Sequence, residues 1–174
     1  MTFNTIVIDA PWNERGSGKI KRGADRHYPL LKEHQIIETI IQSPVWLPDD
    51  HAHLYFWVTA NHMESGLFVM RALGFRYITN VCWVKQRPGL GQYFRGEHEL
   101  CLFGVRTGGR GPVHRTDRRD IRSTVRADRT RHSVKPATFF AMVEARSRGP
   151  YLEMFARQPR EGWTVMGNEV DDNE

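Results

Sequence analysis

Short apolar runs alternate with segments of helical periodicity along the chain. Runs rich in β-branched and aromatic residues predict strands over residues 5–8, 53–58, 77–84, 100–105, 151–155 and 163–166. Apolar residues spaced three and four apart predict helices over residues 36–41 and 63–73. Strands separated by helices predict an α/β fold, in which a mostly parallel sheet carries helices on both faces.

Glycine and proline mark the ends of several elements. Gly74 follows the second predicted helix and is expected to stop it. Pro136 is expected to open a third helix at its first position, because that position needs no backbone N–H. Phe139, Phe140 and Val143 of that helix are then predicted to point into the core.

Positive charge is concentrated in one segment. The 174 residues hold 25 lysines and arginines against 20 aspartates and glutamates, a net charge of +5. Residues 106–132 alone hold nine arginines and three aspartates, so the rest of the chain is close to neutral. A Gly- and Arg-rich segment of this kind is typical of a loop that contacts phosphates, and a solvated, disordered loop is the alternative.

Composition excludes several classes of protein. A content of 40% hydrophobic residues supports a sizeable core, and the length fits one domain. No apolar stretch is long enough to cross a membrane and the start lacks a signal peptide, so we expect a cytoplasmic protein that does not enter a membrane. Cys82 and Cys101 lack Cys-x-x-Cys spacing and are expected to be buried free thiols.

Two short motifs do not carry the chemistry that they suggest. The Gly-Ser-Gly-Lys of residues 16–19 lacks the rest of a phosphate-binding loop. Asn13 occupies the position of the motif's first glycine, and Ile20 occupies the position of the Ser or Thr whose hydroxyl binds Mg²⁺. His51 and His53 can share one face of a strand, but no third ligand follows at a suitable spacing. We therefore predict no metal site.

The sharpest chemical signal is the tetrapeptide Asp9-Ala10-Pro11-Trp12, which follows the first predicted strand directly. In parallel sheets, ligands bind beyond the carboxyl ends of the strands. The Asp9 carboxylate and the Ala10 carbonyl can accept the two N–H groups of an adenine amine and so restore its lone pair, while Trp12 stacks on the base. The alternative is an ordinary proline turn with Trp12 in the core.

This tetrapeptide resembles the Asp-Pro-Pro-Trp signature of the N6-adenine methyltransferases of the METTL/MTA type, with Ala10 in place of the first proline. Further blocks resemble that family in the same order: LYFWVT at 54–59, WVK at 83–85, ELCLFGV at 99–105, SVKP at 133–136, LEMFAR at 152–157 and GWTVMGNE at 162–169. The chain looks more like the small prokaryotic or phage members of that family. The resemblance implies a single Rossmann-like methyltransferase domain over residues 1–174, which transfers a methyl group from S-adenosylmethionine to the N6 amine of adenine.

The resemblance also implies roles for individual residues. The catalytic pocket would consist of Asp9, Ala10, Pro11 and Trp12. The cofactor would contact Asp9 again, Lys135 through its methionine carboxylate, and Glu153, Arg157, Asn168 and Glu169 near its ribose and adenine. The alternatives are structural: Glu153 can pair with Arg157, and Asn168 can cap a turn.

A base inside a duplex hides its amine, so the target adenine must be flipped out or unpaired. Two basic loops, residues 13–28 and 106–132, are predicted to hold the nucleic acid around it. The residues expected to contact it are Lys19, Lys21, Arg22, Arg26, Tyr28, Arg118, Arg119 and Arg122. With no separate target-recognition domain, DNA is favoured over RNA as the substrate. RNA and a non-catalytic nucleic-acid-binding subunit remain alternatives, and a homodimer is an open option.

Overall fold

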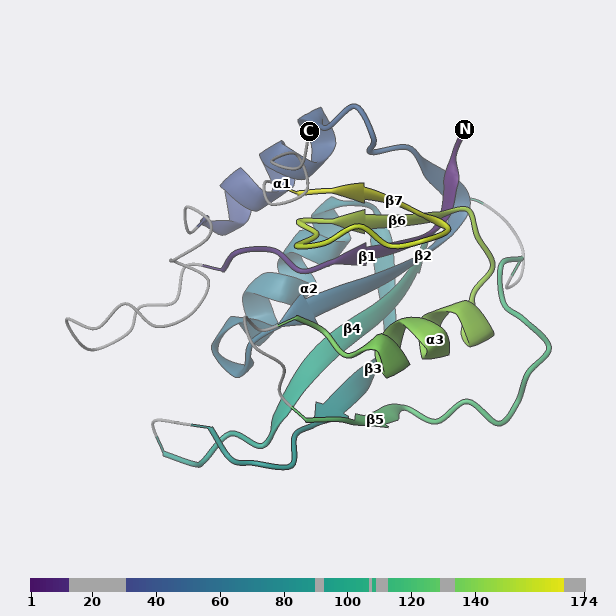
Figure 1. Ribbon diagram of the computed structural model, residues 1–174. Helices are drawn as coiled ribbons and strands as arrows, with labels where there is room; N and C mark the ends of the chain where they lie inside the picture. Colours follow the sequence, from purple (N-terminus) through teal and green to yellow (C-terminus); the bar gives the residue numbers. More distant parts are fainter. Residues whose placement is uncertain (13–30, 90–92, 107, 109–112, 129–133, 168–174) are drawn as a thin grey trace.

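A computed structural model describes residues 1–12, 31–89, 93–106, 108, 113–128 and 134–167 (Figure 1). Within these residues one seven-stranded sheet has the order β5-β3-β4-β2-β1-β6-β7. Its strands are β1 (Phe3–Ile8), β2 (Pro48–Val58), β3 (Phe75–Val84), β4 (His98–Arg106), β5 (Thr124–Arg126), β6 (Tyr151–Met154) and β7 (Trp163–Met166). β4 runs antiparallel to both of its neighbours, and the other pairs are parallel. The predicted mostly parallel α/β sheet is confirmed.

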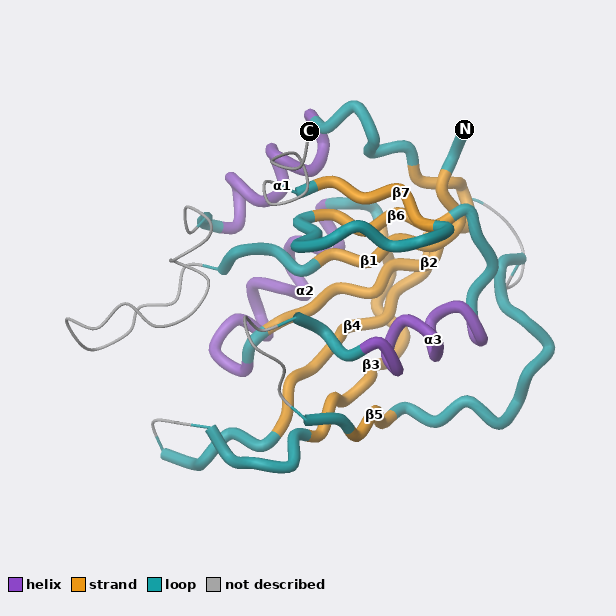
Figure 2. Tube along the Cα trace, in the orientation of Figure 1, coloured by secondary structure: helices purple, strands orange, loops and turns teal. Residues whose placement is uncertain are grey.

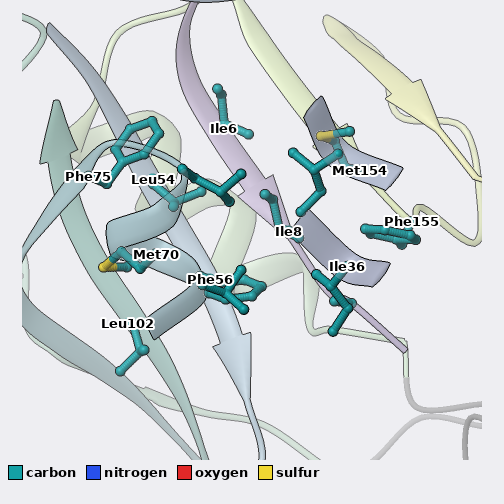
Figure 3. Packing of buried hydrophobic residues seen from close by; sticks show 14 of the residues in the cluster. Ile6, Ile8, Ile36, Leu54, Phe56, Met70, Phe75, Leu102, Met154 and Phe155 are labelled. Carbon is teal, nitrogen blue, oxygen red and sulfur yellow. The ribbon is translucent and has the colours of Figure 1, made fainter. Parts of the chain in front are cut away.

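The helices lie on both faces of this sheet, as predicted (Figure 2). α1 (Glu33–Gln42) and α2 (Met63–Ala72), which follows the short 3-10 turn η2 (Ala60–His62), cover one face, and α3 (Ala137–Arg146) covers the other. Ile36 of α1 and Met70 of α2 pack with Ile8 and Phe56 of the sheet (Figure 3). Phe139 of α3 lies in a second core cluster on the opposite face.

Successive residues of β2 point to opposite faces, which explains why its sequence is continuously apolar. Leu54 and Phe56 pack in the core beneath α1 and α2, whereas Tyr55 and Trp57 pack in the core beneath α3. A strand buried on both faces has no polar side to show, so its signal is an apolar run rather than an alternation. The same holds for β1, where Val7 joins the α3 side.

Three details differ from the sequence-based expectations. The third helix begins at Ala137, with Pro136 at the extended position just before it. β5 lies inside the arginine-rich segment that was expected to be a loop, because Val125 is buried in the core beneath α3. Cys101 is a buried free thiol as predicted, but Cys82 is only half-buried.

Gly74 ends α2 as predicted, with a φ of 84° that favours glycine. No helix in the described part of the chain is long and apolar enough to cross a membrane.

Candidate active site

The tetrapeptide from Asp9 to Trp12 leaves the carboxyl end of β1, between β2 and β6. The backbone N–H of Asp9 donates to the Met154 carbonyl at the end of β6, at 3.4 Å. The N–H of Trp12 donates to the Ala10 carbonyl at 2.9 Å, which closes a tight turn around Pro11. The Asp9 side chain is therefore anchored at the edge of the sheet where ligands of parallel sheets bind.

A chain of alternating charges holds Asp9 in place. The Lys135 ammonium lies 2.8 Å from Oδ2 of Asp9 and 3.4 Å from Oε2 of Glu99. Lys85 forms an ion pair with the other oxygen of Glu99. Asp9 and Lys85 directly follow β1 and β3, Glu99 lies in β4, and Lys135 lies in the segment before α3, so the network joins the centre of the sheet to α3.

The network is mostly buried, which makes its charge balance important. The Lys135 side chain is 9% exposed. Burial by itself would lower the pKa of Lys135, but the charges of Asp9 and Glu99 outweigh it and raise that pKa. Burial would likewise raise the pKa of Glu99, but Lys135 and Lys85 hold it below its usual value. Lys135 and Glu99 are therefore both ionised at neutral pH.

Two tryptophans support this network. The Lys135 ammonium lies 5.0 Å from the centroid of the Trp57 ring, in a cation–π contact. Trp12 is 4% exposed, and its Nε1–H donates to the Trp57 carbonyl at 3.1 Å. The Trp12 ring stacks on His62 with centroids 5.2 Å apart. The structure thus places Trp12 in the core, as the alternative interpretation had it, and stacking of Trp12 on a base stays a prediction.

Glu153 lies at the same edge of the sheet, near the end of β6, and its partner is a residue that the sequence did not suggest. Its Oε2 accepts a hydrogen bond from Nε of Arg160 at 3.2 Å. The Arg160 guanidinium lies 3.2 Å from the centroid of the Phe140 ring. Burial raises the pKa of Glu153, and Arg160 opposes that shift. Sequence reasoning weighed Arg157 as the partner because of its spacing and missed Arg160.

The other residues predicted to contact the cofactor or nucleic acid fall into two groups, those outside the described residues and those that line cavities. Lys19, Lys21, Arg22, Arg26, Tyr28, Asn168 and Glu169 lie outside the described residues. Arg118 and Arg119 line a cavity at the opposite edge of the sheet, beside the start of β2, and Arg122 lines a smaller neighbouring cavity. The structure therefore does not bring Arg118 and Arg119 together with Asp9. The connection from β4 to β5 begins at the far edge of the sheet, which explains this separation. The contact of Arg118, Arg119 and Arg122 with nucleic acid stays a prediction.

The sequence-based predictions also left out two exposed aromatic residues at the edge of the sheet where Asp9 lies, called Asp9's edge below. Tyr93 and Phe94 are 94% and 88% exposed in the connection between β3 and β4, which leaves the sheet at the edge where β1 ends (Figure 1). Arg87 and Arg95 flank them in sequence. A Tyr-Phe pair in a Gly-rich, basic turn is a signal that the sequence itself contained.

Comparison with known proteins places this site in a family. The model of the MT-A70 family matches residues 3–169. The chain is 32% identical to the putative N(6)-adenosine-methyltransferase MT-A70-like of Medicago truncatula and 30% identical to the N(6)-adenosine-methyltransferase catalytic subunit METTL3 of Homo sapiens. Each match covers 97% of this chain but only 26% and 28% of the relative, so the chain spans about a quarter of their length. It is 25% identical to the type II methyltransferase M.MunI of Mycoplasma sp, over 98% of this chain and 79% of that protein. The chain belongs to the MT-A70 family.

Proposed function

We propose that this chain transfers a methyl group from S-adenosylmethionine to the N6 amine of adenine in DNA. The observation that carries the proposal is the ion pair of 2.8 Å between Lys135 and Asp9 at the carboxyl end of β1. Membership of the MT-A70 family and the methyltransferase names of the relatives support it.

The charges at this edge suit the cofactor. An ammonium group has three N–H donors, and Asp9 and Glu99 occupy two of those of Lys135. The third can bind the carboxylate of the cofactor's methionine moiety. The negative charges of Asp9 and Glu99 are complementary to the positive charge of a sulfonium or ammonium group. When bound, S-adenosylmethionine supplies the electrophilic methyl group.

In the proposed reaction, this chain positions the amine and stabilises its reactive form. Oδ2 of Asp9 is held by Lys135, and Oδ1 accepts one N–H of the adenine amine. The Ala10 carbonyl already accepts the N–H of Trp12, and its second lone pair accepts the other N–H. Held in this way, the amine would present its lone pair to the methyl group, and the N–C bond would form as the C–S bond breaks. The electron pair of the C–S bond would stay on the cofactor's sulfur, and the proton released from the nitrogen would pass to solvent water. Fixed acceptors of this kind lower the barrier because they need no reorganisation during the reaction.

The choice of DNA rests on the resemblance to small prokaryotic members. RNA is the second candidate, because the plant and human relatives are named for adenosine, a ribonucleoside. The assignments of Glu153, Arg157, Asn168 and Glu169 to the cofactor stay predictions, as do those of Lys19, Lys21, Arg22, Arg26 and Tyr28 to nucleic acid. A single domain over residues 1–174, a homodimer and a cytoplasmic location stay predictions as well.

A methylation assay on duplex DNA, single-stranded DNA and RNA of the same sequence tests the proposal. We expect labelled methyl groups to pass to adenine in DNA and not to an oligonucleotide in which every adenine is replaced. Transfer to RNA alone would establish the second candidate. No transfer to any substrate, together with no binding of S-adenosylmethionine in calorimetry, would establish a non-catalytic subunit and end the proposal.

Tyr93 and Phe94 are expected to stack on unpaired bases beside the flipped adenine. Because stacking contributes about 1–3 kcal/mol per base, we expect the double change Tyr93→Ala and Phe94→Ala to weaken binding of single-stranded substrate roughly fivefold or more. Fluorescence anisotropy measures this. Phe68→Ala is the matched control, because Phe68 is also an exposed aromatic residue, 58% exposed on α2. Equal affinities for the double variant and the control would contradict the stacking role.

A further inference from the structure

A large cavity lies away from Asp9 and is strongly basic. Its volume is about 600 Å³, and it lies between the start of β2, the end of β4, the end of α3 and the segment before β5. Six arginines line it, against the single carboxylate of Asp117: Arg76, Arg106, Arg115, Arg118, Arg119 and Arg146. A cavity with this balance of charge is suited to an anion rather than to an apolar ligand.

Several of these guanidinium groups lack a counter-charge. Arg118 donates to Oδ1 of Asp120 at 3.0 Å, and Arg106 donates to the Pro48 carbonyl at 3.1 Å. Within the described residues, no ion pair is formed by Arg76, Arg115 or Arg119, and Arg146 has only a longer-range attraction to Asp120. Uncompensated arginines that converge on one hollow repel each other, and a bound anion removes that repulsion.

A buried histidine in the cavity wall adds no charge to the cavity at neutral pH. His53 lies in the cavity wall, and its Nδ1 shares a hydrogen bond of 2.7 Å with the Ser147 hydroxyl. Burial lowers the pKa of His53 to about 4, and the positive charges of His114, Arg146 and Arg115 lower it in the same direction. The histidine is therefore neutral near pH 7, and the positive charge in the wall comes from the arginines.

The cavity lies at the amino end of β2, whereas Asp9 follows the carboxyl end of β1. Ile8 pairs with Phe56, so Asp9 lies near the level of Trp57, six residues beyond His51 in the cavity wall. At about 3.3 Å per residue, this places the cavity roughly 20 Å from Asp9 along the strands. Phosphates of one duplex strand advance about 3.4 Å along the axis, so the separation corresponds to about six base pairs.

We infer that this cavity is a second phosphate-binding site, which holds the nucleic-acid backbone about six base pairs away from the target adenine. This inference rests on the proposed function, because it assumes that the bound substrate is a nucleic acid. Arginine forks bind two phosphate oxygens at once, which suits the arginine-only lining of the cavity. Substrates that extend less than this distance from the target adenine reach the active site but not the cavity.

Binding of two duplexes tests the site. A duplex of about 24 base pairs with a central adenine reaches the cavity. A hairpin with the adenine in the middle of a stem of about six base pairs extends only about three base pairs from it and does not. Arg76→Gln and Arg119→Gln each remove one charge from the cavity. Arg71→Gln is the matched control, because Arg71 is an exposed arginine on α2, on the other face of the sheet. Fluorescence anisotropy between about 50 and 200 mM salt gives the affinities and their salt dependence.

We expect each cavity variant to bind the long duplex roughly fivefold more weakly, with a salt slope reduced by about 0.9, and to bind the short hairpin as the wild type does. An equal loss of affinity for the long duplex and for the short hairpin would mean that the arginines attract nucleic acid only through general charge, and it would overturn the site. A loss of affinity of the same size with Arg71→Gln would mean the same. Calorimetry with pyrophosphate is the third arm. If Arg119→Gln abolishes pyrophosphate binding but leaves the affinity for the long duplex unchanged, the cavity is a site for small anions instead.

The failure of this site and the failure of the proposed function have different signatures. Methylation of the short hairpin and binding of S-adenosylmethionine report the active site alone, because neither requires the cavity. If both are intact while Arg76→Gln and Arg119→Gln bind the long duplex with wild-type affinity, the cavity assignment fails and the proposed function stands.

Discussion

Asp9→Asn is expected to lower the rate of methyl transfer at least about a hundredfold, the usual cost of losing one preorganised polar group from an active site. Asparagine has nearly the same shape as aspartate, but its amide nitrogen is a donor. Either the amide presents its N–H groups to Lys135, which is a donor itself, or it presents them to the adenine amine. In both orientations one of the two hydrogen bonds proposed for Asp9 is lost, because two N–H donors then face each other.

The loss of charge acts in the same direction. Asp9 is the nearer of the two carboxylates around Lys135, at 2.8 Å against 3.4 Å for Glu99. Without it, Lys135 shifts toward Glu99, and the position of the cofactor's carboxylate shifts with it. We therefore expect a lower kcat and a weaker affinity for S-adenosylmethionine, measured by single-turnover kinetics and by calorimetry.

Asp50→Asn is the matched control for Asp9→Asn. Asp50 is an exposed aspartate near the start of β2, at the edge of the sheet away from Asp9. The control should keep wild-type activity, and circular dichroism should show both variants folded. An Asp9→Asn variant within about threefold of the wild-type rate would remove Asp9 from the catalytic step, since such a difference is below 1 kcal/mol.

The site shows which parts of this structure could be predicted from the sequence. Apolar runs identified β1 and β2, and the tetrapeptide after β1 marked the edge where ligands bind. Glu99 was not assigned a role, although it begins one of the blocks that resemble the family. The direction of β4 decides its role: only an antiparallel β4 places its first residues at Asp9's edge. Strand direction follows from pairing across the sheet, which a local pattern does not encode.

Arg118 and Arg119 show what a local pattern does not determine, which is the position of a basic segment relative to the active site. Their segment is basic and exposed, as predicted, and it lines a cavity. The described residues 113–123 of the connection run along the far edge of the sheet, on the right-hand side of Figure 1, before β5 returns toward Asp9's edge. Composition predicts that such a segment binds phosphates, but the topology of the sheet decides how far from Asp9 the segment lies.

Lys135→Met is expected to destabilise the fold by about 3–5 kcal/mol, because it leaves Asp9 without its cation and Glu99 with Lys85 alone. Methionine keeps most of the volume of the side chain, so the loss reflects charge rather than a cavity. Urea unfolding measures the effect.

Lys135→Met combined with Glu99→Gln should cost about 0.5–3 kcal/mol less than the two single changes added together, because both act on one ion pair. Strict additivity would show that Lys135 does not stabilise the fold through Glu99.

The pH dependence of Lys135→Met separates the loss of a counter-charge from the loss of packing. In the wild type, Lys135 and Lys85 hold the pKa of Glu99 below its unfolded value of 4.5. Such a carboxylate stabilises the fold above pH 4.5, and that contribution is lost as the pH falls through the lower folded value. The pKa of Lys135 is raised, so Lys135 stays charged at neutral and acidic pH. The difference in stability between the wild type and Lys135→Met should therefore be largest near about pH 7 and shrink well below about pH 4, where a protonated Glu99 no longer needs a cation. A difference that is the same at both pH values would mean that Lys135 contributes its methylene chain and not its charge.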